Sequence, residues 1–409
     1  MQSQANPKRF QIEVPDAILD DLRHRLANVR WPDSAPDSDW SYGVDLEYLR
    51  SLVTYWRDQY QWRRAEAMLN KFDQYTMPID GIDLHFIHQP GVGPQPTPLL
   101  LMHGWPTSIV DFHKIIPMLT DPARFGGDPQ DAFTVVAPSL PGHGFSFKPN
   151  QPRFGIVQIA DSMTKLMSAL GYDRFAAQGA DWGAFISTRL GHAHPQRLIG
   201  IFISLLTIPR SLPSSEHLND AERAFSAQLA HWLKEETGYS AQMATKPQTL
   251  AYALTDSPVG LAAWIIEKYR TWSDCAGDVD RHFGRDTLLT NVMLYWVTGA
   301  INSTFWPYYA RHREPWIVPE GRPVSVPTGY AEFPRRSSRH RARLPSAITA
   351  TSSAGHECSA AVTSRPWRHR TSSCTNAGNS SARCAEDDRG RSHFLAHVDS
   401  PPALAYPPD

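Results

Sequence analysis

Cysteine is scarce in most of this 409-residue sequence. Three of the four cysteines, Cys358, Cys374 and Cys384, lie beyond residue 336, so Cys275 is the only one in the first 335 residues. A disulfide framework is therefore not expected in the body of the chain. None of the cysteine spacings matches a zinc site, and no metal is predicted.

Long apolar runs and a strong net charge are also missing. No uninterrupted apolar stretch reaches the ~18–20 residues that a membrane span needs. The first residues, MQSQANPKRFQIEV, lack the apolar segment of a secretory signal. A formal net charge of −1 creates no global field that would attract nucleic acid or an acidic membrane. We therefore expect a cytoplasmic protein with neither nucleic acid nor membrane as a partner, while an oligomer stays possible.

The body of the chain alternates between patterns of buried strands and of helices. Short apolar runs in PTPLLLMHGWP, AFTVVAPSLPGHG, DRFAAQGADWG and LIGIFIS indicate strands. Helix-like spacing at Ile156–Leu170 and in GAFISTRLGHAHP separates them. This alternation predicts an α/β fold with a parallel sheet.

Other segments flank or interrupt this series. Helical periodicity appears at Ala17–Asn28 and Leu46–Asn70, and Asp80-Gly81 lies between two alternating runs as in a β-hairpin. Residues 211–315 are mostly helical in period and rich in aromatics, as expected of a lid inserted into the sheet fold. RPVSVPTGYAEFP then resumes the strand pattern.

The segment Gly179-Ala180-Asp181-Trp182-Gly183 has the small-x-nucleophile-x-small pattern of a nucleophile elbow, with Asp181 in place of the usual serine. A carboxylate is ionised at neutral pH and attacks a saturated carbon, leaving an alkyl ester. Asp181 therefore indicates an epoxide or an alkyl halide as substrate rather than an ester. An acidic surface turn would fit these five residues alone, but the flanking strand and helix favour the elbow.

His103-Gly104-Trp105-Pro106 follows the first apolar run, where α/β-hydrolases place an N–H of the oxyanion hole. We predict that the N–H groups of Trp105 and Trp182 stabilise the oxyanion formed when water attacks the ester; an ordinary strand-end turn is the alternative. Ring opening also needs an acid near the epoxide oxygen, and neutral phenols suit that role. The segments TGYSAQM and FWPYYARHR offer tyrosines, which could equally be packing residues.

Several long motifs resemble the microsomal-type epoxide hydrolases. They are FQIEVPDAILDDLRHRLANVRWPD, LLMHGWPTSIVDFHKIIPML, ATKPQTLAYALTDSPVGLAAWIIEKYRTWSD and LLTNVMLYWVTGAINSTFWPYYARHRE. The resemblance implies the α/β-hydrolase fold, a mostly parallel sheet, no metal or organic cofactor, and a small-molecule epoxide as substrate. It assigns Asp181 as nucleophile and Tyr239 and Tyr308 as proton donors, rather than Tyr309. A role in detoxification or in catabolism of aromatic hydrocarbons would follow.

The resemblance runs from about residue 8 to Pro334 and divides the chain into parts. The expected parts are an N-terminal meander (1–95), the first part of the core (96–210), a helical lid (211–320), the resumed core (321–335) and an aberrant, disordered tail (336–409). Because the sequence begins at the meander, without an anchoring helix, it resembles the soluble bacterial members of the family.

The remaining catalytic residues of the family are missing from the sequence. The family places an acid two residues after a Phe-Pro pair, and later a histidine in a Gly-Gly-His-Phe segment that activates water. Here Arg336 occupies the acid position after Phe333-Pro334, and Glu332 precedes the pair. His393 in RGRSHFLAHVD comes too late in the chain and His356 in AGHEC matches poorly, so neither is assigned.

A displaced reading frame would account for the basic tail. Taking the last base of each codon with the first two of the next permits Glu-Ile-Leu-Thr-Pro over residues 335–340 and Gly-Gly-His-Phe-Ala-Ala-Met over residues 360–367. These are family segments in family order, and the histidine falls 27 codons after the acid. We predict a one-base slip near codon 335 and, for the chain as it stands, at best formation of an alkyl ester that persists; a genuinely divergent tail is the alternative.

Two further functions stay open. A haloalkane dehalogenase would share an aspartate elbow, but it would hold the halide with lid groups other than the two tyrosines. An inactive remnant is the second, because loss of the final strand and helix of the core could exceed the whole stability margin of ~5–15 kcal/mol.

Overall fold

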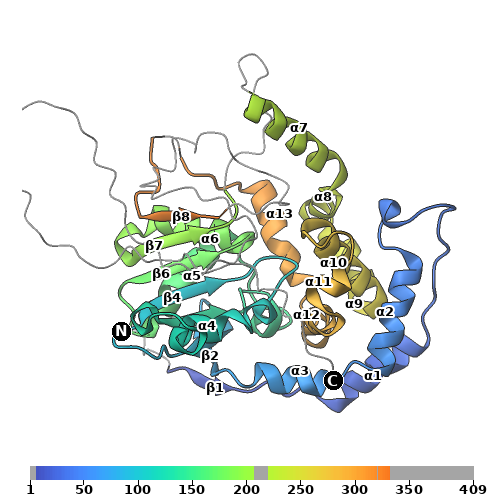
Figure 1. The fold of residues 1–409 in the computed structure, drawn as a ribbon, viewed down its shortest axis with the longest axis horizontal. Coiled ribbons are helices and arrows are strands. Elements are labelled where there is room, and N and C mark those ends of the chain that lie inside the picture. Colours follow the sequence, from blue (N-terminus) through green and yellow to red (C-terminus); the bar gives the residue numbers. More distant parts are fainter. Residues whose placement is uncertain (1–5, 207–219, 320, 332–409) are drawn as a thin grey trace, which may run out of the picture.

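An eight-stranded sheet forms the centre of the computed structural model, which describes residues 6–206, 220–319 and 321–331 (Figure 1). The spatial order is β1-β2-β3-β5-β4-β6-β7-β8. The first three pairings are antiparallel, and those from β5 onward are parallel. The strands are β1 (Lys8–Phe10), β2 (Gln74–Ile79), β3 (Ile82–Gln89), β4 (Thr97–Met102), β5 (Phe133–Pro138), β6 (Phe175–Gly179), β7 (Leu198–Ile203) and β8 (Thr328–Tyr330). The predicted α/β-hydrolase fold is confirmed, whereas β1 was not predicted from the sequence.

The central strands are continuous apolar runs because they are buried. Every residue of β6 is buried, as are the last four residues of β4. At the antiparallel side, β2 and β3 form the predicted hairpin, with Asp80 at φ 51° and Gly81 at φ 81°. Two successive residues with positive φ are typical of a type I′ turn, whose twist suits a two-residue hairpin.

Helices pack against the sheet and position its connections. The core helices are α4 (Ile115–Thr120), α5 (Ile156–Ala169) and α6 (Trp182–Ala193). The first packs against β5, whereas α5 and α6 lie side by side and α6 also contacts β6 and β7. The chain thus enters α6 directly from the end of a buried parallel strand, as a nucleophile elbow requires.

The lid lies beside the sheet, at the right of Figure 1. Its helices are α7 (Asp220–Glu235), α8 (Gly238–Thr245), α9 (Pro247–Asp256), α10 (Pro258–Trp272), α11 (Val279–Phe283), α12 (Arg285–Thr298) and α13 (Trp306–Arg313). Among the described residues, no single helix is long and apolar enough to cross a membrane; α9 and α10 pass that test only as a pair, bent by 115°.

The N-terminal helices contact the lid. They are α1 (Asp16–Ala27), α2 (Leu46–Asp58) and α3 (Trp62–Leu69). The hydroxyl of Tyr48 donates to Asp280 at 2.7 Å, and that of Tyr55 donates to Asp286 at 2.8 Å. The helical pattern over Leu46–Asn70 is therefore two helices, broken before Trp62, rather than one continuous element.

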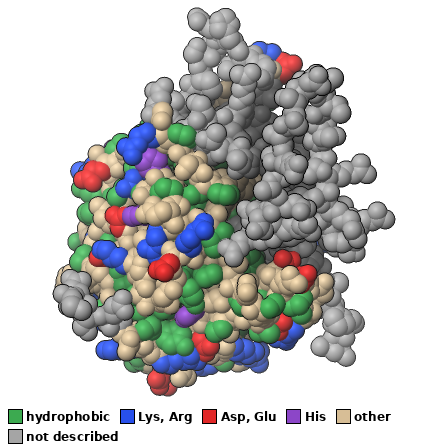
Figure 2. All heavy atoms as spheres, turned by 90° about the vertical axis from the view of Figure 1, so that its left-hand side faces the viewer, with side chains coloured by type: hydrophobic (Ala, Val, Ile, Leu, Met, Phe, Trp, Pro, Cys, Tyr) green, Lys and Arg blue, Asp and Glu red, His purple; other side chains and the backbone are tan. Residues whose placement is uncertain are grey.

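Several predicted features lie outside the described residues. They include the Phe333-Pro334 pair, Glu332, Arg336, the histidines at 356 and 393, and the whole predicted tail. On the face shown in Figure 2, basic and acidic side chains are interspersed over the described residues.

Candidate active site

Asp181 lies on a sharp bend between β6 and α6. Its φ of 49° and ψ of −120° place a non-glycine residue in a rarely adopted conformation. The bend is tight, because a Cβ on Gly179 would lie 2.1 Å from the carbonyl carbon of Gly183. The glycines of the motif therefore let strand and helix approach closely enough to present the carboxylate.

The turn after β4 reaches this carboxylate through its backbone. The N–H of Trp105 donates to Oδ1 of Asp181 at 2.9 Å. This approach depends on Gly104, where a Cβ would lie 2.4 Å from the Cβ of Asp181. Trp182 is the first residue of α6, so its N–H has no acceptor within the helix and lies at the positive end of the helix dipole. Both predicted oxyanion-hole residues thus flank Asp181.

His103 holds the same turn in place. The N–H of Leu140 donates to its Nε2 at 3.1 Å, so the proton lies on Nδ1, which donates to the carbonyl of Gly104 at 2.9 Å. Burial lowers the pKa of His103 to about 4, and the ring is neutral at pH 7. Sequence reasoning used only the N–H of this motif and missed the structural role of its histidine.

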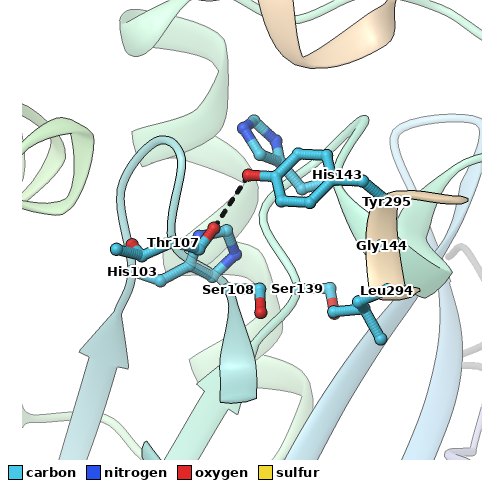
Figure 3. Close-up of a pocket in the computed structure, with 8 residues that line it drawn as sticks. All are labelled: His103, Thr107, Ser108, Ser139, His143, Gly144, Leu294 and Tyr295. Atoms are coloured by element: carbon cyan, nitrogen blue, oxygen red, sulfur yellow. Dashed lines mark hydrogen bonds between the residues drawn. The ribbon is translucent and has the colours of Figure 1, made fainter. Parts of the chain in front are cut away.

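The lid helix α12 is hydrogen-bonded to the turn as well. The side-chain amide of Asn291 donates to the carbonyl of Pro106 at 2.6 Å and accepts from the hydroxyl of Ser108 at 2.6 Å. One helical turn later, the hydroxyl of Tyr295 donates to the carbonyl of Thr107 at 2.9 Å (Figure 3). Sequence reasoning missed this clamp, although a polar asparagine in the apolar stretch LLTNVMLYW was a signal.

Figure 3 shows a small pocket behind the turn. The residues that line it are His103, Thr107, Ser108, Ser139, His143, Gly144, Leu294 and Tyr295. Neither Asp181 nor a predicted proton donor is among them. Burial lowers the pKa of His143 to about 3, so this imidazole is neutral near neutral pH. The predicted nucleophile and proton donors therefore lie outside this pocket, whose lining includes residues of the turn after β4.

The two predicted proton donors, Tyr239 and Tyr308, pack against each other and against Trp105 and Trp182. Tyr239, from α8, stacks on Trp105 with ring centroids 5.3 Å apart and planes 7° apart. Tyr308, from α13, packs edge-on to Trp182 at 4.7 Å. The tyrosine rings themselves are 5.7 Å apart. The structure therefore brings together the carboxylate, both oxyanion-hole residues and both lid tyrosines.

Tyr309 lies elsewhere. It stacks on Trp306 at 5.0 Å and carries the guanidinium of Arg313 over its ring, 3.4 Å from the centroid. Tyr308 is instead buried, and its ring packs against those of Trp182 and Tyr239. Burial, with the nearby Tyr239 and Asp181, raises the pKa of Tyr308 well above 10, so the phenol keeps its proton at pH 7.

Two further buried hydrogen-bond donors lie beside Tyr308. The indole N–H groups of Trp105 and Trp182 are both buried, and that of Trp105 has no hydrogen-bond partner among the described residues. Unpaired donors are costly in a protein interior and often mark a ligand site. Among the described residues, no group of three or more His, Cys, Asp or Glu side chains could hold a metal ion. The arrangement suits nucleophilic attack by a carboxylate with proton donation from phenols.

The residues of this site lie in two segments that match known family profiles. Residues 7–112 match the profile described as "Epoxide hydrolase N terminus", and residues 97–248 match "alpha/beta hydrolase fold". The first match contains the turn at Trp105, and the second contains Asp181 and Tyr239.

Individual proteins agree with the profiles. A protein of Stigmatella aurantiaca, provisionally named an epoxide hydrolase, is 43% identical over 331 residues, covering 81% of this chain and 74% of the relative. Epoxide hydrolase 1 of Oryctolagus cuniculus is 36% identical over 352 residues, covering 80% and 77%. The crystal structure of juvenile hormone epoxide hydrolase from the silkworm Bombyx mori superposes with a TM-score of 0.72 at 29% identity, covering 82% and 84%.

Proposed function

The chain belongs to the epoxide hydrolase family of the α/β-hydrolase fold, and on that basis we propose that it opens a small-molecule epoxide by forming an alkyl ester on Asp181. One observation carries the proposal: the N–H of Trp105 donates to Oδ1 of Asp181 at 2.9 Å, while the indole of the same residue stacks on Tyr239, whose ring contacts that of Tyr308. A solvated acidic turn would have neither a fixed backbone donor nor phenols above it.

In the first step, a carboxylate oxygen of Asp181 forms a bond to one epoxide carbon. The carbon–oxygen bond of the ring breaks, and its electron pair stays on the epoxide oxygen. That oxygen takes a proton from a phenol, Tyr308 or Tyr239, and becomes a hydroxyl group. The hydrogen bond from Trp105 fixes Oδ1 as the carbonyl oxygen of the resulting ester.

In the second step, water attacks the ester carbonyl. Negative charge then develops on Oδ1, where the N–H groups of Trp105 and Trp182 stabilise it. Collapse of this intermediate breaks the bond between the carbonyl carbon and the ester oxygen and releases a vicinal diol. Water needs a base for this attack, and the sequence has Arg336 at the family's acid position and no Gly-Gly-His-Phe segment.

We therefore propose that the chain completes the first step and stalls before the second. The experiment is intact-mass analysis of the full chain after addition of styrene oxide. We expect one persistent adduct that peptide mapping assigns to Asp181, and none in Asp181→Asn. Asp83→Asn, at a partly exposed surface ion pair, is the matched control and should label normally. Steady diol production by the unchanged chain would contradict the stalled reaction, and an adduct elsewhere would contradict the nucleophile.

The dehalogenase alternative has its own test. A chloroalkane would alkylate the same carboxylate and release chloride, without needing the two phenols. Chloride release that survives Tyr239→Phe and Tyr308→Phe, together with no labelling by styrene oxide, would favour that reaction. The base sequence of codons 330–375 tests the origin of the tail: stop codons in the offset frame would exclude the proposed slip.

A further inference from the structure

A lysine side chain lies against one of the two lid tyrosines. The Nζ of Lys268, on α10, is 5.2 Å from the ring centroid of Tyr239 and 5.4 Å from that of Trp272. Its side chain is only 9% exposed. A buried ammonium group loses hydration, and aromatic faces replace only part of it. Such a costly position is informative when the neighbouring ring is a candidate proton donor.

The ammonium group is held in this place by acids as well as by rings. Glu267 forms an ion pair with Lys268 at 2.5 Å. Glu236 accepts from the indole N–H of Trp272 at 3.2 Å. Burial raises the pKa of Glu236, while Lys268 lowers it, so the charge of Lys268 acts on both acids. The position over Tyr239 is therefore part of a fixed ionic and aromatic cluster.

We propose that Lys268 is a positioning residue that strengthens Tyr239 as a proton donor, an inference that rests on the proposed ring-opening reaction. As the phenol donates to the epoxide oxygen, negative charge grows on Tyr239. A fixed positive charge over its ring stabilises that charge. Because the phenol is neutral before the reaction, the stabilisation is larger in the transition state than in the bound substrate and accelerates ring opening.

Other ionisable groups lie near Tyr239 and Lys268 among the described residues, including His231, which acts on Glu236. Tyr308 faces it from α13, and the carboxylate of Asp181 lies at the start of α6. Glu267 and Glu236 lie on the lysine side of the ring. The three acids oppose phenolate formation, so Lys268 is the positive charge that favours it among these groups.

The test is the single-turnover rate of ester formation with styrene oxide, followed by intact mass in the full chain. We expect Lys268→Met to slow this step roughly 3- to 30-fold, the range of a buried cation–π contact. Lys268→Arg should restore most of the rate because it retains the charge. Lys165→Met, which removes an exposed lysine paired with Asp80, is the control and should leave the rate unchanged.

The pH profile separates this role from a structural one. Without the ammonium group, the phenol loses its proton at higher pH, so the alkaline fall in the rate of ester formation should move upward in Lys268→Met. In a Tyr239→Phe background, the same substitution should have no further effect on the rate. A rate of ester formation in Lys268→Met equal to that of the unchanged chain would overturn the inference. It would also be overturned by a slower rate whose alkaline fall stays at the same pH and whose loss adds fully to that of Tyr239→Phe. If Lys268→Met does not fold, Lys268→Gln is measured by the same criteria. Failure of the unchanged chain to form any ester would instead overturn the proposed function, and this inference with it.

Discussion

The side-chain amide of Asn291 donates to the backbone carbonyl of Pro106 at 2.6 Å, joining the lid to the turn that carries the N–H of Trp105. The same amide group accepts from Ser108. The lid therefore does more than cover the site. It fixes the backbone segment that contacts Asp181, and we expect the proton donors and the oxyanion hole to keep a constant geometry relative to each other.

Replacing Asn291 by Leu should uncouple the lid from the turn that carries the N–H of Trp105. The carbonyl of Pro106 and the hydroxyl of Ser108 would stay buried without these partners, which should lower the free energy of unfolding by about 1–3 kcal/mol. Ester formation should slow as well, because the N–H of Trp105 loses its support. Urea unfolding and labelling with styrene oxide measure the two effects. Asn302→Ala, which removes an exposed amide contact to Gln248, should change stability by less than about 0.5 kcal/mol. Equal effects of the two substitutions would contradict the clamp.

Local patterns were enough to predict most of the fold. The apolar runs became β4, β5, β6 and β7, since strands buried on both faces must be apolar throughout. The Asp80-Gly81 pair became a hairpin turn because both residues tolerate positive φ. The elbow at Asp181 followed from small residues where strand and helix approach each other.

Contacts between distant segments could not be predicted in this way. The tautomer of His103 depends on the N–H of Leu140, and the clamp depends on Asn291, far along the chain from Pro106. Helical periodicity over Leu46–Asn70 did not reveal the break between α2 and α3, where Tyr60 turns its hydroxyl toward Thr290 of the lid. Such features depend on contacts between residues far apart in the sequence, and local sequence patterns do not reveal which residues make those contacts.

The two neighbouring tyrosines of the lid should differ sharply in function. Tyr308→Phe should slow ester formation by about 10²–10⁴-fold, the usual contribution of a general acid, reduced towards the lower value because Tyr239 stays in place. Tyr309→Phe is the matched control, because that ring packs on Trp306 away from Asp181. The single-turnover rate with styrene oxide measures both. A larger loss of rate in Tyr309→Phe than in Tyr308→Phe would mean that Tyr309, rather than Tyr308, is the proton donor.

The free energy of unfolding should decrease below about pH 6.5. Burial lowers the pKa of His85 to about 3, of His103 to about 4 and of His143 to about 3. Each ring stays neutral in the folded chain, whereas it gains a proton on unfolding below its ordinary pKa of ~6.5. Each ring contributes fully to the free energy of unfolding above that pH. The contribution is lost as the pH falls toward the pKa of the ring in the folded chain, by about 1.4 kcal/mol per pH unit.

Urea unfolding at a series of pH values between 4 and 7 checks this dependence. In His143→Phe one titrating ring is absent, so the slope of the unfolding free energy against pH should fall by one proton. Asn302→Ala, which removes an exposed amide contact and no ionisable group, is the control and should leave the slope unchanged. An unchanged slope in His143→Phe would mean that this ring is protonated in the folded chain.

Restoring the offset frame from codon 335 should convert a single labelling event into turnover. The restored chain would gain an acid at codon 336 and a histidine at codon 363, and with them a base for the water that attacks the ester. The unchanged chain should release no diol, because the ester on Asp181 persists, while the restored chain should release many equivalents per enzyme, measured by chromatography after addition of styrene oxide. Replacing the restored histidine by Gln should return the enzyme to the stalled state, with the adduct on Asp181 recovered by intact mass. Because folding alone could also improve with the restored segment, this variant is decisive: it keeps the segment and removes only the base. Continued diol release from it would show that water is activated by some other group.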